Sequence, residues 1–243
     1  MYANRITNDA YRSASSKIDT VIIPVGSLEA HGHHCPLGTD NLIPERLCQD
    51  IESRLRDRVM IVPPVNYGYT PVLDQFPGSV SIPAETLIAL YTEIGRAFVK
   101  WGAKNVVFMN GHGGNTPLLR VACDRIAASG GTAAAISWWA TYSKEILGIC
   151  STQGHAGEDE TSLVLAIDAA LVDPKGTKSH MKKAFMTPIA GPGERAAFYP
   201  EAMNGDPSRA SAEKGERLFA MILEKNLEYI ERIRRGDLTD DIL

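Results

Sequence analysis

Short apolar segments alternate along this chain with longer segments of helical periodicity. The apolar segments contain many β-branched residues, and an almost continuously apolar strand is typical of a sheet that is buried on both faces. They cover residues 20–26, 59–65, 105–111 and 132–139. The helical segments cover residues 41–54, 84–101, 116–128 and about 158–172, and a last helix starts around Ala210. This alternation predicts an α/β fold in which helices cover both faces of a central, mainly parallel sheet.

The expected domain organisation follows from the length of the chain and from its continuity. A chain of 243 residues is long enough to form one large domain with a sizeable core. We find no internal repeat, low-complexity segment or linker that would divide it. Residues 175–208 contain many Pro, Gly and polar residues, which predicts long surface loops. We therefore expect a single domain over residues 1–243.

The charge and the apolar segments argue against several classes of partner. The net charge is −4 and no basic run stands out, so nucleic acid is not an expected partner. The first twenty residues lack the apolar core of a secretion signal, and the longest apolar runs are too short to span a membrane. The four cysteines are scattered, and in a chain without an export signal we expect free thiols. These features predict a cytoplasmic protein that binds neither nucleic acid nor membranes.

Five of the six histidines lie in three short segments that follow predicted strands. The segments are "GSLEAHGHHCPLGTD" (26–40), "GHGGN" (111–115) and, at a greater distance from its strand, "GHAGEDETS" (154–162). The carboxyl ends of parallel strands lie along one edge of a sheet, and ligands bind in the crevice outside that edge. We therefore expect the three segments to converge on one site.

The residue types in these segments are typical of a metal site. Imidazole nitrogen and carboxylate oxygen are suitable ligands for Zn²⁺, Mn²⁺ and Fe²⁺. In an extended backbone Glu29 and His31 point to the same side. Asp40 follows a turn-rich segment, where its carboxylate can bridge two cations about 3.5–4 Å apart. The glycines around His112 allow this side chain to reach inward.

Each of these residues also has a purely structural interpretation. Asp is a favoured N-cap residue, so Asp40 alone is compatible with a cap of the helix at 41–54. The segment "GHGGN" alone is compatible with a tight turn, and a lone histidine near a strand end is commonly a hydrogen-bonded structural residue. Acids and imidazoles that occur together on three loops at one sheet edge favour the metal site.

Five motifs resemble the creatininase (creatinine amidohydrolase) family. They are "GSLEAHGHHCPLGTD", "FPGSVSI", "NGHGGN", "GHAGEDETS" and "GDPSRASAEKGERL", in this order, and the resemblance covers residues 19 to about 220. It implies a three-layer α/β/α domain and a metal-dependent hydrolase with two divalent cations, commonly assembled as a homo-hexamer. Reactions of the family include opening of the creatinine ring, removal of a formyl group, cleavage of a peptide during redox-cofactor maturation and opening of a keto-inositol ring.

The resemblance also implies roles for individual residues at the metals. Glu29 and His112 would hold one metal, His31 would hold the other, and Asp40 would bridge the two. Creatininases take a further acidic ligand from a glutamate two residues after the histidine of the second segment, and this position is Gly114 here.

Glu158 and Glu160 are the candidates to replace that missing ligand. Glu160 is favoured because it starts the helical stripe that continues with Leu163, Val164 and Ile167. The alternative for Glu160 is a buried acid that orients a ligand histidine.

Other residues are placed around the metals. His155 matches the family position for proton transfer. His155 and Glu160 are therefore the candidate catalytic residues. A hydrogen-bonded cap of the helix that begins at Glu158 is the alternative for His155. His34, Glu158 and Asn115 are expected to contact the ligands or the substrate. We expect residues 66–80 and 186–207 to form the walls of the substrate pocket. A neighbouring subunit could contribute further wall residues.

Departures from the family pattern argue against creatinine itself as the substrate. Ala30 and His33 replace residues that are common in the family, and the tryptophans of the creatinine pocket have no clear counterpart. The pair Trp138 and Trp139 lies in a strand-like run that is compatible with the core. The predicted function is metal-dependent hydrolysis of a C–N amide bond in a small molecule. The alternatives are ring opening of a keto-inositol or a similar cyclic β-dicarbonyl, and a non-catalytic protein that binds a metal or ligand.

Overall fold

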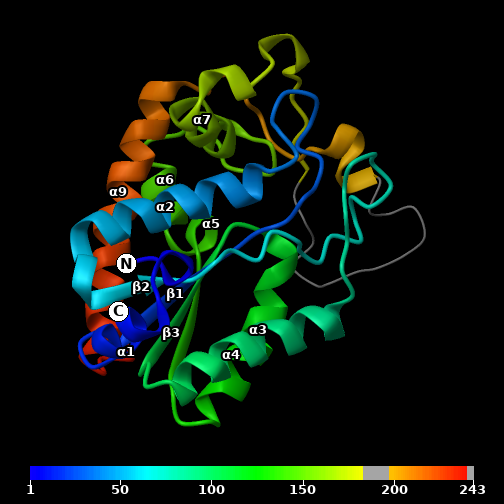
Figure 1. Cartoon of the computed structure of the whole chain (residues 1–243). Coiled ribbons are helices and arrows are strands. Elements are labelled where there is room, and N and C mark those ends of the chain that lie inside the picture. Colours follow the sequence, from blue (N-terminus) through cyan, green and yellow to red (C-terminus); the bar gives the residue numbers. More distant parts are fainter. Residues whose placement is uncertain (183–196, 240–243) are drawn as a thin grey trace.

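A four-stranded parallel sheet forms the centre of the molecule (Figure 1). The computed structural model describes residues 1–182 and 197–239. The strands lie in the order β2-β1-β3-β4. Their bounds are β1 Thr20–Val25, β2 Val59–Ile61, β3 Asn105–Asn110 and β4 Thr132–Ser137. Val25 pairs with Asn110, and Asn110 pairs with Ser137, so three strands end at the same level.

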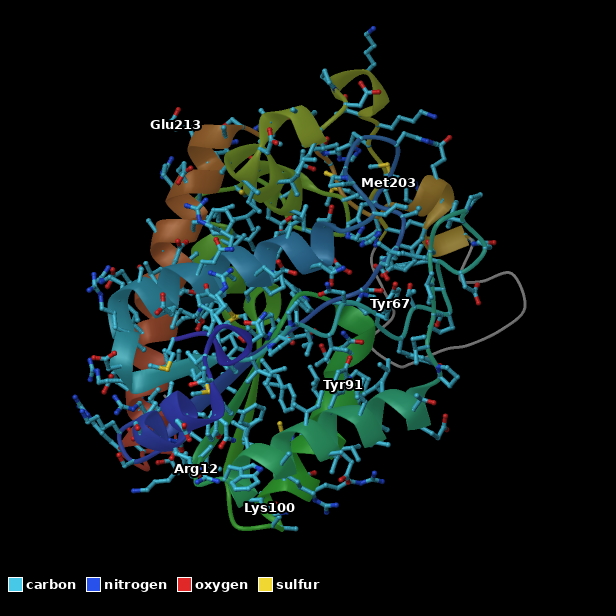
Figure 2. All side chains as sticks on the ribbon, in the orientation of Figure 1. Arg12, Tyr67, Tyr91, Lys100, Met203 and Glu213 are labelled. Atoms are coloured by element: carbon cyan, nitrogen blue, oxygen red, sulfur yellow. The ribbon has the colours of Figure 1, made fainter. Side chains whose placement is uncertain are left out.

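Helices cover both faces of this sheet, which confirms the predicted α/β/α architecture. Alternate strand residues point to opposite faces, and each face has its own apolar cluster. One face packs against α2 (Thr39–Leu55), α7 (Glu158–Ile167) and α9 (Ala212–Arg234), with the short α5 (Trp138–Thr141) and α6 (Ser143–Ile146). The other face packs against α1 (Asn8–Ser15), α3 (Ala84–Lys100) and α4 (Thr116–Ala127). Tyr91 of α3 is fully buried in this second layer (Figure 2).

Several element boundaries differ from the prediction. The strand predicted over 59–65 ends at Ile61, and the Pro63–Pro64 pair that follows has no N–H to donate to a ladder. The strand predicted over 132–139 ends at Ser137, because Trp138 starts α5. The helix predicted to reach about residue 172 ends at Ile167, where the chain becomes extended at Asp168. Asp168 then caps a 3₁₀ turn, Ala169–Leu171.

Helix α1 was not predicted from the sequence. Ala14 is its only buried residue, so the helix carries no wide apolar stripe. The cysteines are free, as expected. No helix within residues 1–182 and 197–239 has the length and apolar character needed to cross a bilayer.

The start of α2 lies directly against the ends of β1 and β3. A Cβ atom on Gly111, which follows β3, would collide with the backbone carbonyl of Asp40 in the first turn of α2. Glycine at this position therefore permits the close contact. Helix α2 begins at Thr39 with Gly38 as its N-cap, so the alternative role of Asp40 as the cap is wrong. The close approach brings the Asp40 side chain to the carboxyl edge of the sheet.

Candidate metal centre

A cavity of about 240 Å³ lies at the carboxyl edge of the sheet. Side chains from all three histidine-containing segments line it, as the sequence predicts. These are Glu29 and Asp40 from the first segment, His112 from the second, and His155 and Glu160 from the third. Three distant parts of the sequence therefore meet at one site.

Two groups of possible ligand atoms meet in this cavity and share Asp40. One group consists of Glu29, Asp40 and His112, and the other of His31, Asp40 and Glu160. Within each group the ligand atoms lie within 4.8 Å of one another. The Oδ2 atom of Asp40 is 3.0 Å from Nδ1 of His112, and its Oδ1 atom is 3.0 Å from Nε2 of His31. The two oxygens of one carboxylate thus face different groups.

Backbone carbonyls fix the histidine rings. The Nε2 atom of His112 donates to the Tyr69 carbonyl at 2.9 Å, and Nδ1 of His31 donates to the Glu29 carbonyl at 3.1 Å. In a neutral imidazole the other nitrogen then carries a lone pair. In both residues this second nitrogen faces the carboxylates, which is the arrangement that metal-binding histidines have.

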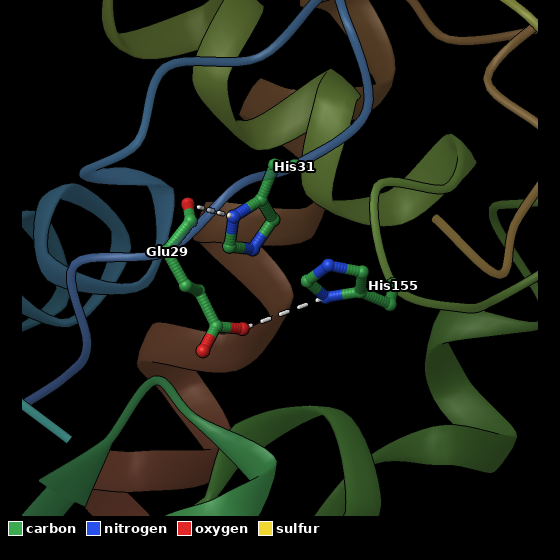
Figure 3. A group of neighbouring side chains, drawn as sticks. All are labelled: Glu29, His31 and His155. Carbon is green, nitrogen blue, oxygen red and sulfur yellow. Dashed lines mark hydrogen bonds and ion pairs between the residues drawn. The ribbon is translucent and has the colours of Figure 1, made fainter. Parts of the chain in front are cut away.

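His155 has a related arrangement. Its Nε2 atom donates to the Ala30 carbonyl at 3.1 Å, and its Nδ1 atom lies 3.9 Å from Oε1 of Glu29 (Figure 3). Glu29, His31 and His155 form a third group of atoms that could hold a cation. The N-cap of α7 is Gly157, and no side chain caps this helix, so the alternative role of His155 as the cap is wrong.

Two carboxylate oxygens of the site have no hydrogen-bond donor within the described residues. Glu29 and Asp40 are almost completely buried, and neither Oε2 of Glu29 nor Oδ2 of Asp40 accepts a hydrogen bond from residues 1–182 or 197–239. Buried acceptors normally have partners. A divalent cation with nitrogen and oxygen ligands would satisfy these oxygens, so the residues fit such an ion.

The pKa values reflect this excess of negative charge. Burial, reinforced by the charges of Asp40 and Asp159, raises the pKa of Glu160 to about 8. Burial opposes the charge of His31, but the carboxylates of Asp40, Glu160 and Glu29 together outweigh burial and raise the pKa of His31 to about 10. Without a cation, protons therefore neutralise part of the site. A metal that binds here must displace them.

Glu160, rather than Glu158, reaches the cavity. Its Oε2 atom lies 3.7 Å from Nε2 of His31. The Oε2 atom of Glu158 instead accepts hydrogen bonds from the backbone N–H groups of Ser151 and Thr152, and its Oε1 atom pairs with Lys214. Glu158 is not among the residues that line the cavity, and its carboxylate is turned toward the loop before His155.

Gly114 leaves no room for the ligand found in creatininases. A Cβ atom at this position would collide with the Tyr69 carbonyl and with the Nε2 atom of His112. The contact between those two groups is the hydrogen bond that orients His112. A side chain at position 114 would therefore disturb a histidine of the first group.

The remaining predicted residues support the site from outside it. His34 is buried, and its Nε2 atom contacts the Thr161 hydroxyl at 3.0 Å. The Nδ2 atom of Asn115 donates to the Gly26 carbonyl at 2.9 Å, while its Oδ1 atom accepts the Tyr69 N–H at 3.1 Å. Asn115 thereby ties the end of β1 to the segment that carries Tyr69.

The cavity walls include residues that the sequence did not identify individually. They are Tyr69, Thr70, Val72, Leu73, Trp139, Gln153, Asp159 and Tyr199. The segment 66–80 contributes residues to the cavity wall, as predicted. Within the predicted segment 186–207, residues 186–196 lie outside the described residues, and Tyr199 lines the cavity. Trp138 is in the core, whereas Trp139 lines the cavity. The sequence indicated which segments would form walls of the cavity, but it did not indicate which of their residues would line it.

The fold and the site define a class of protein. Buried carboxylates and imidazoles that converge at the carboxyl edge of a parallel sheet are typical of metal-dependent hydrolases. This chain is a hydrolase of the amidohydrolase type. The family model described as Creatininase, creatinine amidohydrolase, matches residues 4–230, so the chain belongs to the creatininase family. The resemblance seen in the motifs is thereby confirmed.

Individual relatives differ in their activities. The chain is 34% identical over 226 residues to a mycofactocin precursor peptide peptidase of Mycobacterium ulcerans (strain Agy99), over 89% of this chain and 86% of the relative. It is 30% identical over 265 residues to a 3-dehydro-scyllo-inosose hydrolase of Thermotoga maritima, over 97% of this chain and 83% of the relative. A solved structure described as "Creatininase Mn" has a TM-score of 0.84 and 25% identity, over 96% of this chain and 98% of that chain.

Proposed function

We propose that this protein binds two divalent cations and hydrolyses a C–N amide bond, cyclic or linear, in a small molecule. Glu29, Asp40 and His112 would hold one cation, and His31, Asp40 and Glu160 the other. The observation that carries the proposal is the position of Asp40, whose two oxygens face the two groups. The donor set suits Zn²⁺, Mn²⁺ or Fe²⁺.

Two such cations, when bound, supply a water of lowered pKa and polarise a carbonyl group. The protein supplies the proton carrier. Burial and the neighbouring His31 lower the pKa of His155 to about 4, so its ring is neutral near pH 7. Because the Nε2–H group of His155 donates to the Ala30 carbonyl, the Nδ1 atom of His155 carries the lone pair. Nδ1 can then accept a proton from the attacking water and pass it to the leaving nitrogen.

The relatives and the cavity narrow the substrate class. A peptidase among the relatives supports a linear amide, and a cavity of about 240 Å³ admits one small group rather than an extended ligand. The inosose hydrolase supports ring opening of a keto-inositol or a similar cyclic β-dicarbonyl as the second candidate. In that reaction the leaving atom is carbon, and His155 would return the proton to it.

Broader expectations accompany this proposal. We infer one domain over residues 1–243, a homo-oligomer and a cytoplasmic location, on the basis of the continuous sequence and the family. Sedimentation of the purified protein tests the oligomer, for which the family resemblance implies a hexamer.

The decisive experiment combines metal analysis with assays. Protein purified without chelator and supplemented with Mn²⁺ or Zn²⁺ is expected to hold two metal equivalents per chain. Short peptides, cyclic amides, formamides and keto-inositols are then assayed in parallel. Asp40→Ala is expected to lose metal and activity, whereas Asp124→Ala, which removes a carboxylate that is 72% exposed on α4, serves as the matched control. Full metal content and full activity in Asp40→Ala would disprove the proposal, and bound metal without any hydrolysis would favour a binding protein.

A further inference from the structure

Tyr199 lines the cavity although it lies outside the three ligand-bearing segments. Its ring meets the His155 ring edge-on, with the centroids 5.4 Å apart and an angle of 89° between the planes. The His155 ring also packs against the His31 ring, with the centroids 4.2 Å apart. Tyr199 therefore contacts the proposed proton carrier, which in turn contacts a proposed ligand.

The position of Tyr199 is fixed by contacts to the first ligand segment. Its ring packs on a small apolar cluster that includes Ala30, Leu73 and Ala202. The Ala202 carbonyl accepts a hydrogen bond from the Gly32 N–H at 2.8 Å. Ala202 and its neighbour Glu201 both have a φ of 55°, a strained conformation that persists only where the surroundings enforce it. The segment therefore contacts the ligand-bearing loop on both sides of His31, at Ala30 and at Gly32.

The hydroxyl of Tyr199, a residue that lines the cavity, has no hydrogen-bond partner within the part of the chain that the structure describes. The hydroxyl is therefore available to donate a hydrogen bond to a ligand in this cavity. Burial, together with the charges of Glu29 and Glu160, raises the pKa of Tyr199 to about 12. The hydroxyl therefore keeps its proton near pH 7 and can act as a donor.

We propose that the Tyr199 hydroxyl is a catalytic hydrogen-bond donor to the carbonyl oxygen of the substrate. This inference rests on the proposed function. When water adds, a carbon–oxygen bond forms and the carbonyl electron pair moves onto the oxygen. When the carbon–nitrogen bond then breaks, the nitrogen takes the proton carried by His155. Tyr199 transfers no proton in either step; its hydrogen bond strengthens as negative charge develops on the oxygen.

A role in packing alone makes a different prediction from a role as donor. Tyr199→Phe keeps the ring that contacts His155 and removes only the hydroxyl. If the ring alone is needed to orient His155, this variant retains full activity. If the hydroxyl acts as a donor, kcat falls about 100- to 1,000-fold, as on removal of one oxyanion donor, and KM changes little.

The first experiment compares Tyr199→Phe with the wild type as metal-loaded enzymes on the substrate found in the assays above. Metal content and melting temperature are measured alongside and are expected to be unchanged. Tyr67→Phe is the matched control, because Tyr67 is 49% exposed and does not line the cavity. Unchanged kcat and KM in Tyr199→Phe would overturn the proposal.

The second experiment does not depend on turnover. Inorganic phosphate, a tetrahedral oxyanion, is titrated calorimetrically into manganese-loaded wild type, Tyr199→Phe and Tyr67→Phe. Loss of a hydrogen bond to a charged group is expected to raise the Kd for phosphate at least about tenfold in Tyr199→Phe only. If the wild type hydrolyses nothing in the assays, the proposed function fails while this titration still decides the role of Tyr199. Equal phosphate affinity in the two proteins would then reject that role.

Discussion

The Oε2 atom of Glu160 accepts a hydrogen bond from the backbone N–H of Ala156 at 2.7 Å. Ala156 has a φ of 54°, so a residue with a side chain occupies the left-handed region to make this contact. The strained turn precedes α7 by one residue, and Glu160 lies in the first turn of that helix. Local backbone geometry therefore holds the Glu160 carboxylate beside His31.

Glu160→Gln is expected to weaken binding of one of the two cations. Glutamine has nearly the same shape but lacks the charge that a divalent ion requires. Loss of residues that merely orient ligands typically costs about 10- to 100-fold in metal affinity, so loss of a ligand should cost at least about 100-fold. Metal analysis after dialysis should find about one equivalent per chain. Two retained equivalents would show that Glu160 is not a ligand.

Glu158→Gln should affect stability rather than metal content. The carboxylate of Glu158 is buried, and it accepts hydrogen bonds from the backbone N–H groups of Ser151 and Thr152. It also forms an ion pair with Lys214. Removing the charge weakens these hydrogen bonds and should lower the free energy of unfolding by about 2 kcal/mol. Urea unfolding measures this change, with Glu216→Gln as control, because Glu216 is 60% exposed. A metal deficit in Glu158→Gln at full stability would contradict the distinction drawn between the two glutamates.

Removal of metal should destabilise the protein. Without cations, the buried carboxylates Glu29, Asp40 and Glu160 repel one another. A ligand at about 100 times its Kd stabilises the folded state by about 2.7 kcal/mol. For a chain of this size that amounts to a change in Tm of about 5–10 °C. Differential scanning calorimetry should show this decrease after chelation and its recovery with Mn²⁺ or Zn²⁺. An unchanged Tm would argue against a metal in this cavity.

Asn115→Asp should destabilise the protein although it changes a single atom. The Nδ2 atom of Asn115 donates to the Gly26 carbonyl in a fully buried position, and an aspartate oxygen there would repel that carbonyl. We expect a loss of about 1–3 kcal/mol in the free energy of unfolding. The measurement is chemical unfolding of the two proteins at pH 7. Equal stability would mean that this hydrogen bond does not hold β1 to the Tyr69 segment.

The sequence predicted the sheet well because its signals come from burial. The strands at 20–26 and 105–111 are largely apolar, and β1 and β3 are buried along their whole length between two helical layers. The strand at 59–65 was overestimated, since apolar character alone does not reveal where a proline pair ends the ladder. Helix α1 is short and mostly polar and buries only Ala14, so no run of apolar residues marks it in the sequence.

The site was predictable where unusual residue types coincide with strand ends. Glu29, His31, Asp40 and His112 converge because parallel strands end at one edge, a geometric rule that needs no coordinates. Tyr199 carries no such signal, because it follows no strand and reaches the cavity only through packing on Ala30 and Leu73. The partner of Glu158 carries no signal for a similar reason, since Lys214 lies 56 residues away in the sequence.

The pH dependence of stability should include a contribution from Asp19, at the start of β1 and far from the cavity. Burial opposes its charge, but Arg234 of α9 donates to Oδ1 at 2.8 Å and to Oδ2 at 3.2 Å, and the pKa of Asp19 is lowered. A lowered folded-state pKa means that the stabilisation is present above the unfolded value of about 3.9 and is lost as the pH falls through the folded value. Because both side chains are partly exposed, screening limits the effect, and Asp19→Asn should cost about 1 kcal/mol at pH 7. Urea unfolding at pH 7 and near pH 3 should show the difference between the two proteins shrinking at the lower pH. A difference that stays constant or grows on acidification would mean that the Asp19–Arg234 pair does not stabilise the fold through its charge.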